Sequence, residues 1–342
     1  MRHAWLLLLS LSAAFAQPPH ISNARLDTQA VTNLDNAIHK LLAASTGPEW
    51  AGYAVPMIPG EHHSCCWNSD QCCGRCNLES HQQSSSSTDR TPPGGVVKLE
   101  GPPTLVVLLR LSNHAIDKVQ ARTLDCELDA GGLPFHWLTN VSPAESINYL
   151  ASLAPDHKGA IHPLAMHADP AADSALDRLA SPGQPEKQRE DAAFWLGSAR
   201  GRRGVEILKA MLTRDPSDQL RRHLMFALSV SHEPEALTQL LDSARNDRSP
   251  EVRSQALFWL AQKAGQKETA AISRAIAEDP DTKVKKQAVF ALSQLPPNEG
   301  VPLLVHVARS NANPEVRKQA MFWLGQSKDD RALKFFEEVL GK

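Results

Sequence analysis

The feature that most constrains the fold of this chain is an internal repeat with a step of 32 residues. Its clearest copy runs from Val316 to Gln326 and reads VRKQAMFWLGQ. Stepping back by 32 from its phenylalanine meets a phenylalanine every time: Phe322, Phe290, Phe258, Phe226 and Phe194. The leucines two places later keep the same step: Leu324, Leu292, Leu260, Leu228 and Leu196. A period this strict indicates a stack of small repeating units.

Each repeating unit is expected to be a hairpin of two helices, and its second helix carries the motif. Proline stands just ahead of the predicted helices, where its missing N–H costs nothing. These dipeptides are Asp169-Pro170, Asp215-Pro216, Ser249-Pro250, Asp279-Pro280 and Asn313-Pro314. We therefore predict a mainly α chain, with a right-handed α-solenoid of about 32-residue hairpins over residues 143–342. Residues 331–340 are expected to form the first helix of a final, incomplete unit.

One face of each motif helix is predicted to form the core. Val316, Ala320, Trp323 and Leu324 share that face on a helical wheel. Tryptophan and alanine alternate along the array, at Trp195, Ala227, Trp259, Ala291 and Trp323. This alternation favours packing of a large ring over the small residue of the next repeat. A ligand-stacking role for the tryptophans is the alternative.

Opposite charges also keep the 32-residue step. The basic residues are Arg189, Arg221, Arg253, Lys285 and Arg317, and the matching loop residues are Asp215, Asp247, Asp279 and Asn311. We expect ion pairs from loop to helix between adjacent repeats. A basic groove for nucleic acid is the alternative, but 36 Lys and Arg against 38 Asp and Glu argue against a nucleic-acid partner.

A second stripe lies away from the predicted core face and supplies the candidate partner-binding residues. They are Gln255, Phe258, Gln262, Gln287, Phe290, Gln294, Gln319, Phe322 and Gln326. The rings are explained either by lateral packing between neighbouring motif helices or by a concave surface that receives an extended partner. The copies at 189–198 and 221–230 lack the glutamine pair.

The repeat resembles the HEAT repeat superfamily, specifically the short-period type related to phycobilisome-lyase HEAT-like repeats. The motif at 316–326 and its copies at 252–262 and 284–294 carry the resemblance, and the copy at 160–167 is degenerate. The resemblance implies an α-solenoid that binds proteins; some relatives assist chromophore attachment. The whole layout is similar to exported bacterial HEAT-repeat proteins.

The N-terminus has the pattern of a signal peptide over residues 1–16. A short basic start precedes an apolar run, and Ala14-Phe15-Ala16 is a small-x-small cleavage pattern. An uncleaved N-terminal anchor is the alternative. No later stretch is apolar enough to span a bilayer, so we expect a periplasmic or secreted protein with no membrane contact after signal cleavage.

Residues 17–142 are expected to form a small cysteine-rich α+β domain. A helix is predicted over 26–44, and residues 78–95 are predicted to be a linker because they are rich in Ser, Gln and Pro. Residues 50–56 are predicted to be a short extended piece, and strands predicted at 96–99, 105–111, 119–128 and 135–138 are expected to form a short antiparallel sheet. Asp125, Glu127 and Asp129 near His136 suggest a carboxylate–histidine site, although alternating acids also suit the wet face of a strand.

Six cysteines are the candidates for disulfides: Cys65, Cys66, Cys72, Cys73, Cys76 and Cys126. Export favours disulfides, and Cys126 would then tie the sheet to the cysteine-rich loop. Two alternatives are zinc binding by these thiols with His62 and His63, and redox chemistry at Cys73-x-x-Cys76. The spacing lacks paired C-x2-C knuckles, so neither a metal nor a cofactor is predicted.

These patterns favour an exported, non-enzymatic scaffold that binds a protein or peptide on the solenoid. One alternative is a metal- or redox-active N-terminal domain with the solenoid as a docking or regulatory module. A lyase-like HEAT enzyme is the other. Against an enzyme, the sequence has no Gly-x-Ser-x-Gly, no His-Glu-x-x-His and no glycine-rich phosphate loop.

Overall fold

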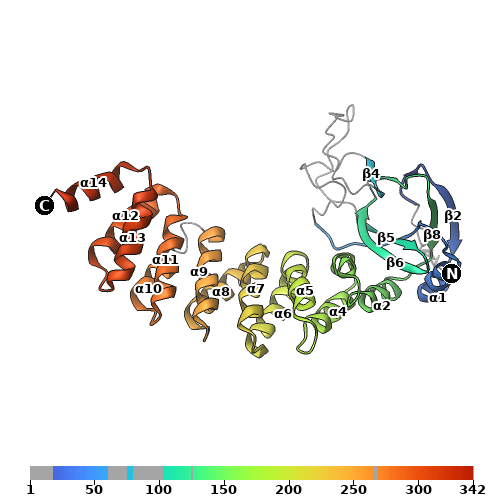
Figure 1. The fold of residues 1–342 in the computed structure, drawn as a ribbon. Helices are drawn as coiled ribbons and strands as arrows, with labels where there is room; N and C mark the ends of the chain where they lie inside the picture. Colours follow the sequence, from blue (N-terminus) through green and yellow to red (C-terminus); the bar gives the residue numbers. More distant parts are fainter. Residues whose placement is uncertain (1–17, 61–74, 80–102, 125, 265–268, 342) are drawn as a thin grey trace, which may run out of the picture. The chain divides into compact units, whose positions relative to one another are not determined.

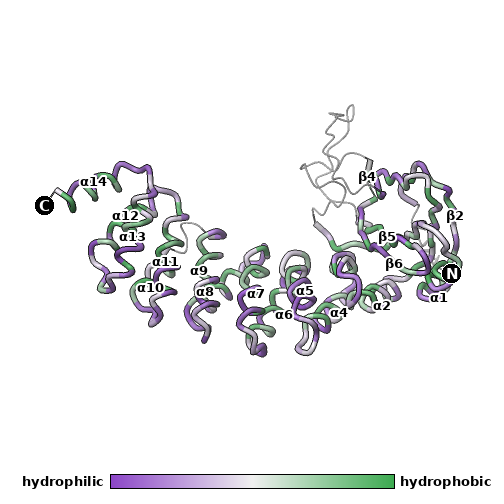
Figure 2. The backbone as a smooth tube through the Cα atoms, viewed as in Figure 1, coloured by the Kyte–Doolittle hydropathy of each residue, from purple (hydrophilic) through white to green (hydrophobic). Residues whose placement is uncertain are grey.

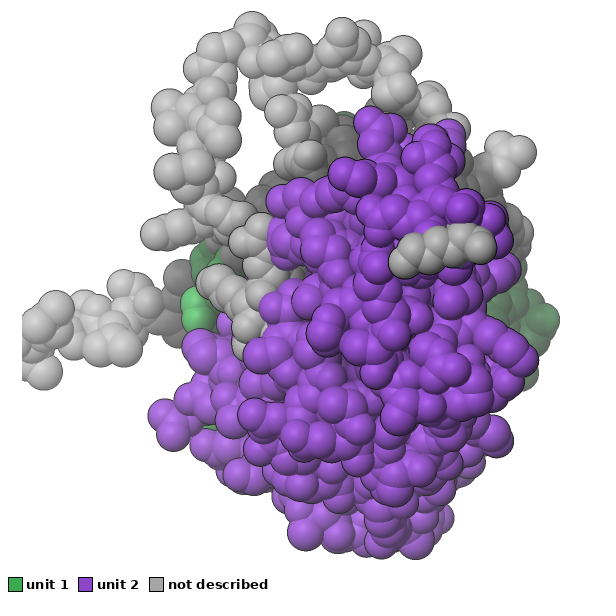
Figure 3. All heavy atoms as spheres, turned by 90° about the vertical axis from the view of Figure 1, so that its left-hand side faces the viewer, with its two compact units in different colours: residues 1–172 green, residues 173–342 purple. Residues whose placement is uncertain are grey.

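The computed structural model describes residues 18–341, apart from 61–74, 80–102, 125 and 265–268. The predicted signal peptide and the predicted strand at 96–99 lie outside these residues. The chain divides into two compact units, one up to Ala172 and one from Asp173 (Figures 1 and 3). The division falls after the predicted boundary at Pro143, because the first helices beyond that residue contact the sheet of the first unit.

The first unit contains a five-stranded sheet in the order β2-β8-β3-β5-β6. These strands are β2 (Arg25–Ala30), β8 (Pro134–Thr139), β3 (Glu49–Pro56), β5 (Thr104–Ser112) and β6 (Ala115–Thr123). The β3–β5 and β5–β6 pairs are antiparallel, but β8 runs parallel to both β2 and β3. The predicted antiparallel sheet is confirmed for β3, β5 and β6, whereas the parallel direction of β8 was not predicted. Strands far apart in the sequence pair here, and local pattern does not report their relative direction.

A smaller sheet pairs β7 (Glu127–Asp129) in parallel with β1 (Ile21–Ser22) and β4 (Arg75–Asn77). The strand predicted over 119–128 is thus divided between β6 and β7. One buried cluster draws residues from both sheets, and its members include Trp50, Cys76, Leu78, Val106, Leu108, Cys126, Leu128, Phe135 and Trp137. Burial of these side chains holds the two sheets together.

Two predictions next to these strands need correction. The helix α1 spans only Leu34–Ala44, where the Asn33 side chain caps its first turn, and the residues before it form the edge strand β2. The predicted linker begins too early, because Leu78 is fully buried and Glu79 is bound to the sheet. Trp50 Nε1 and Arg110 Nε donate to Glu79 Oε1 at 2.7 and 3.0 Å, and Arg110 Nη2 donates to Glu79 Oε2 at 2.8 Å.

Three short helical elements complete the first unit: α2 (Pro143–Leu153), η1 (Lys158–Ala160) and α3 (Ile161–Met166). The start at Pro143 was predicted, and Ser142 with Glu145 forms a capping box there. Two buried hydrogen bonds link three side chains. Ser146 Oγ lies 2.9 Å from the Tyr53 hydroxyl and 2.8 Å from His167 Nε2. They fix α2 against β3.

The second unit, purple in Figure 3, is an array of paired helices (Figure 1). Beginning with α4 (Ala171–Ala180), the helices are α5 (Glu186–Ala199), α6 (Gly201–Arg214), α7 (Asp218–Val230), α8 (Pro234–Asn246), α9 (Pro250–Ala264), α10 (Thr269–Glu278), α11 (Thr282–Ser293), α12 (Pro297–Ser310), α13 (Pro314–Gln326) and α14 (Asp330–Leu340). The motif helices α5, α7, α9, α11 and α13 pack side by side, and the intervening helices form the second layer (Figure 1). The predicted α-solenoid is confirmed.

Apolar residues between the layers form the core of the array, and Figure 2 shows hydrophilic and hydrophobic positions alternating along each helix. Val316, Ala320 and Leu324 are buried as predicted. Trp323 is only half-buried, so its assignment to the core face was wrong. No helix of the described ranges has the length and apolar character needed to cross a bilayer.

Candidate protein-binding surface

The loops before α7, α9, α11 and α13 are shaped by one recurring side-chain oxygen. Oδ1 of residues 215, 247, 279 and 311 accepts a hydrogen bond from the backbone N–H two residues later, at 2.8–2.9 Å. Aspartate and asparagine both make this turn. The turn places the capping residues Ser217, Asp281 and Asn313 at the helix N-termini. These four motif helices therefore begin in the same way, whereas α5 follows Pro185 without a side-chain cap.

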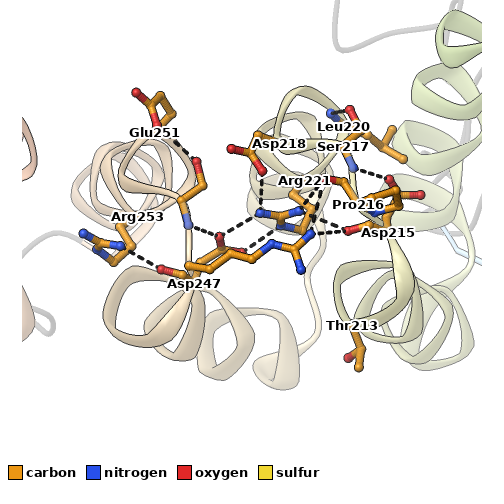
Figure 4. A network of polar contacts seen from close by, with 12 residues as sticks. Thr213, Asp215, Pro216, Ser217, Asp218, Leu220, Arg221, Asp247, Glu251 and Arg253 are labelled. Atoms are coloured by element: carbon orange, nitrogen blue, oxygen red, sulfur yellow. Dashed lines mark hydrogen bonds and ion pairs between the residues drawn. The ribbon is translucent and has the colours of Figure 1, made fainter.

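The predicted ion pairs between repeats are confirmed at three steps, and we name them the Arg–Asp ladder. Its pairs are Arg189 with Asp215, Arg221 with Asp247, and Arg253 with Asp279. Figure 4 shows the middle of the ladder. The hydrogen bonds with Asp279 raise the pKa of Arg253, although burial opposes the shift. Because these arginines are buried and paired, they do not form a basic groove.

The ladder is absent at the fourth step, where Lys285 and Asn311 occupy the two positions. Lys285 Nζ donates to the carbonyl of Ala277 at 3.1 Å, and Asn311 Nδ2 donates to the carbonyl of Ile276 at 3.4 Å. Within the described ranges, no carboxylate lies within ion-pair distance of Lys285. At the fifth position, Arg317 Nη1 donates to the carbonyls of Asn311 and Ala312 at 2.7 and 3.0 Å.

The motif phenylalanines and tryptophans form a row of ring contacts across the motif helices, which we name the aromatic row. Its members are Phe194, Trp195, Phe226, Phe258, Trp259, Phe290, Trp323 and Phe322. Phe258 and Phe290 stack with centroids 6.1 Å apart and planes 3° apart. Phe194 and Phe226 stack at 5.7 Å and 20°. Lateral packing between motif helices therefore accounts for these stacked rings.

The alternation of tryptophan and alanine has its explanation in this row. The ring centroids of Trp259 and Phe226 lie 5.0 Å apart, as do those of Trp323 and Phe290, so these two tryptophans contact the phenylalanine of the preceding repeat. This differs from the predicted packing of tryptophan over the alanine of the next repeat. A repeat with alanine contributes one ring, which is contacted from both sides. A repeat with tryptophan contributes two rings set edge to face.

The aromatic row is also partly exposed to solvent. Phe258, Phe290 and the neighbouring Trp323 are half-buried, and Phe322 is 54% exposed. An exposed ring beside stacked rings offers an apolar surface with little loss of side-chain entropy on binding. The rings therefore pack laterally, and Phe322 at the end of the row is accessible to solvent.

The glutamines flank the aromatic row as the helical spacing requires. Gln255, Gln287 and Gln319 are half-buried, and their partners at the second position, Gln262, Gln294 and Gln326, are exposed. Gln294 donates to Ser293 Oγ at 3.2 Å. In the part of the chain that the structure describes, the side chains of Gln255, Gln287 and Gln319 make no hydrogen bond. Their amides are available to a polypeptide backbone.

His223 is a residue of this surface that sequence reasoning missed. It stands 32 residues before Gln255, so the repeat step alone could have found it. Its ring lies 6.0 Å from that of Phe226, edge to face. Burial lowers the pKa of His223. Burial thus favours the neutral form of the imidazole.

The carboxylate–histidine site suggested by the sequence does not form as proposed. Asp129 accepts hydrogen bonds from Asn23 Nδ2 and the Gly131 N–H, and Asp125 lies outside the described residues. His136 instead lies 3.4 Å from Asp27 and 3.3 Å from Glu49, on neighbouring strands. Among the described residues, no three His, Cys, Asp or Glu side chains gather so as to hold a metal ion.

The structure describes only two of the six cysteines, Cys76 and Cys126. Cys65, Cys66, Cys72 and Cys73 lie outside the described residues, as do His62 and His63. Cys76 and Cys126 are both buried in the cluster that joins the two sheets. Which cysteines pair stays a prediction.

Comparison with solved structures finds several helical proteins of low similarity. YibA of Escherichia coli is 24% identical, with 49% of this chain and 64% of that chain covered and a TM-score of 0.35. The CpcE–CpcF complex of phycocyanin lyase from Nostoc sp. PCC7120 is 24% identical over 46% of this chain and 100% of that chain, at 0.35. Human deoxyhypusine hydroxylase is 17% identical over 58% and 80%, at 0.31.

Comparison with protein families gives one match, to HEAT repeats, over residues 269–342. No curated protein matches the chain. The matched residues contain α10 to α14, and the same paired helices and 32-residue step continue upstream. Residues 269–342 therefore match HEAT repeats, and the helices upstream share their arrangement and step.

Proposed function

We propose that this protein is an exported, non-enzymatic scaffold whose aromatic row binds a protein or peptide segment. The observation that carries the proposal is the exposure of Phe322, which continues a row of stacked and half-buried rings. The glutamine amides beside the rings suit the backbone of an extended segment. Stacked rings also keep the surface rigid, which reduces the entropy lost on binding.

Charge near the row favours a partner with some acidic character. Lys286 and Lys318 occupy the same position on α11 and α13, four residues before the motif phenylalanine. Lys318 is paired with Glu315 at 3.0 Å on the surface, where such pairs contribute little. The two lysines therefore remain able to attract a carboxylate on a partner.

The first unit is proposed to be a structural domain of the exported protein. Burial of Cys76 and Cys126 with large apolar side chains supports a structural role for these two cysteines over a reactive one. Export itself rests on the signal pattern of residues 1–16. Mass spectrometry of the mature N-terminus tests export, and a start near Gln17 is the expected result.

The binding proposal is tested by affinity capture of partners from the exported fraction with the full-length protein. Phe322→Ser removes an exposed ring of the row, and Leu333→Ser removes an apolar side chain of α14 that is 61% exposed. A partner held by the aromatic row is lost with Phe322→Ser and kept with Leu333→Ser. Equal capture by both variants would show that the row is not the binding surface.

A further inference from the structure

A cavity of about 400 Å³ lies where the Arg–Asp ladder is absent, between α10, α11 and α12. Lys285 and Asn311 line it, together with Ile276, Leu303, His306 and Val307. This volume is in the range of small-molecule sites. His306 and Ser310 are exposed and Lys285 is half-buried, so the cavity opens to solvent.

The equivalent place two repeats earlier provides a direct comparison. There a cavity of about 270 Å³ is lined by Arg221 and Asp247, which pair within it, and by Asp242 and Arg248. Stepping forward by 64 residues replaces Asp242 and Asp247 with His306 and Asn311. Both carboxylates are lost, while a cation is kept at Lys285.

The cavity at Lys285 is larger and more apolar than the cavity at Arg221. Gln239 becomes Leu303, Ser243 becomes Val307, and Arg248 becomes Ala312. Loss of the long Arg248 side chain accounts for part of the extra space. The cavity therefore has an apolar wall and one positive group, Lys285, and none of its lining residues is Asp or Glu.

The polar groups around Lys285 leave room for an incoming anion. An ammonium has three donors, and one of them is directed to the Ala277 carbonyl. Asn311 keeps the loop turn through Oδ1, as aspartate does in the other repeats, so the loss of its charge does not disturb the loop. A ligand carboxylate beside Lys285 would supply the negative charge that Asp247 and Asp279 supply in the intact ladder.

We propose that this cavity binds an organic carboxylate with an apolar body, the carboxylate pairing with Lys285 and the body lying against Ile276, Leu303 and Val307. The carboxylate can belong to a small molecule or to the free C-terminus of a peptide. The proposal does not depend on the aromatic row.

The test measures binding to the full-length protein by isothermal titration calorimetry. The probes are 4-methylpentanoate, its amide 4-methylpentanamide, and a short peptide ending in leucine with either a free or an amidated C-terminus. Each carboxylate is expected to bind about tenfold more tightly than its amide, or better, because the amide cannot form the charge-assisted contact with Lys285. Tighter binding of the peptide acid identifies a C-terminus as the source, and tighter binding of the small acid identifies a small molecule.

Three variants locate the site. Asn311→Asp supplies an internal carboxylate and Lys285→Met removes the cation, so each should weaken carboxylate binding about tenfold or more. Lys283→Met changes an exposed lysine of the same helix, which does not line the cavity, and should leave binding unchanged. Circular dichroism confirms that each variant is folded. The proposal is overturned if wild type binds neither acid, if acids and amides bind equally, or if Lys283→Met weakens binding as much as Lys285→Met.

Discussion

Arg253 on α9 holds Asp279 through two parallel hydrogen bonds, Nε to Oδ2 at 2.8 Å and Nη2 to Oδ1 at 3.0 Å. Both residues are about 8% exposed, and Nη1 of the same arginine donates to the Asp247 carbonyl at 2.8 Å. One guanidinium thus joins the loops before α9 and α11. This contact connects consecutive repeats independently of their apolar core.

Replacing Asp279 with Ala should destabilise the array strongly. The change leaves a buried arginine without its carboxylate, and breaking a buried pair of this kind costs about 3 kcal/mol or more. Urea unfolding followed by circular dichroism measures the loss. Asp218→Ala is the matched control. The Asp218 side chain is 55% exposed, so its ion pair with Arg221 should contribute much less to the free energy of unfolding. Equal effects of the two changes would contradict the importance of the ladder.

Phe290→Ala and Phe322→Ala should differ in their effect on stability. Phe290 is contacted by Phe258 and Trp323, so its removal should lower the free energy of unfolding by about 2–3 kcal/mol. Phe322 is more than half exposed, so its removal should cost less than about 1 kcal/mol. The comparison is made by urea unfolding of both variants. A larger loss for Phe322→Ala would show that the exposed ring is structural.

Ser146→Ala should destabilise the first unit by about 1–3 kcal/mol, because it leaves the buried Tyr53 hydroxyl and His167 Nε2 without their shared partner. Ser152→Ala is the control, since the Ser152 hydroxyl bonds only the Tyr149 carbonyl within α2. Thermal unfolding of both variants compares them. A change confined to the control would contradict the proposed role of the two buried hydrogen bonds.

Glu79 makes the first unit sensitive to acid. Hydrogen bonds from Arg110, and to a smaller extent from Trp50, lower its pKa in the folded state below the usual 4.5. The folded state therefore binds fewer protons than the unfolded state, and this stabilisation is present above pH 4.5 and is lost as the pH falls through the lowered pKa. Glu79→Gln should flatten the acid side of a plot of stability against pH. An unchanged acid side would contradict this contribution.

The features predicted well from sequence are those that recur at a fixed step. The 32-residue period placed Arg253 opposite Asp279, because stacked repeats turn sequence spacing directly into spatial spacing. The helical wheel put Val316 and Leu324 in the core. The absence of an ion pair between Lys285 and Asn311 was not predicted, although the substitution of Asn for Asp is plain in the sequence. The contact of Trp323 with Phe290 was not predicted either, because a helical wheel describes one helix and not its neighbour.

The first unit was harder to predict, since its contacts join distant parts of the chain. The pairing of β2 with β8 joins residues more than a hundred positions apart, and nothing in either segment specifies a parallel direction. The helix predicted from Leu26 begins only at Leu34, and Leu26 lies on an exposed edge strand. Glu79 sits in a polar, serine-rich stretch, and only the fold brings Arg110 and Trp50 to it.

Site-specific photo-crosslinking tests the binding surface most directly. A photoreactive residue is placed at Gln326, which is exposed beside the aromatic row, or at Leu333 on α14 as the control, in the full-length protein. The account predicts a discrete crosslinked partner from position 326 that is absent from position 333 and is lost when Phe322→Ser is added. Crosslinks that are the same from both positions, or that persist with Phe322→Ser, would contradict a partner bound on the aromatic row.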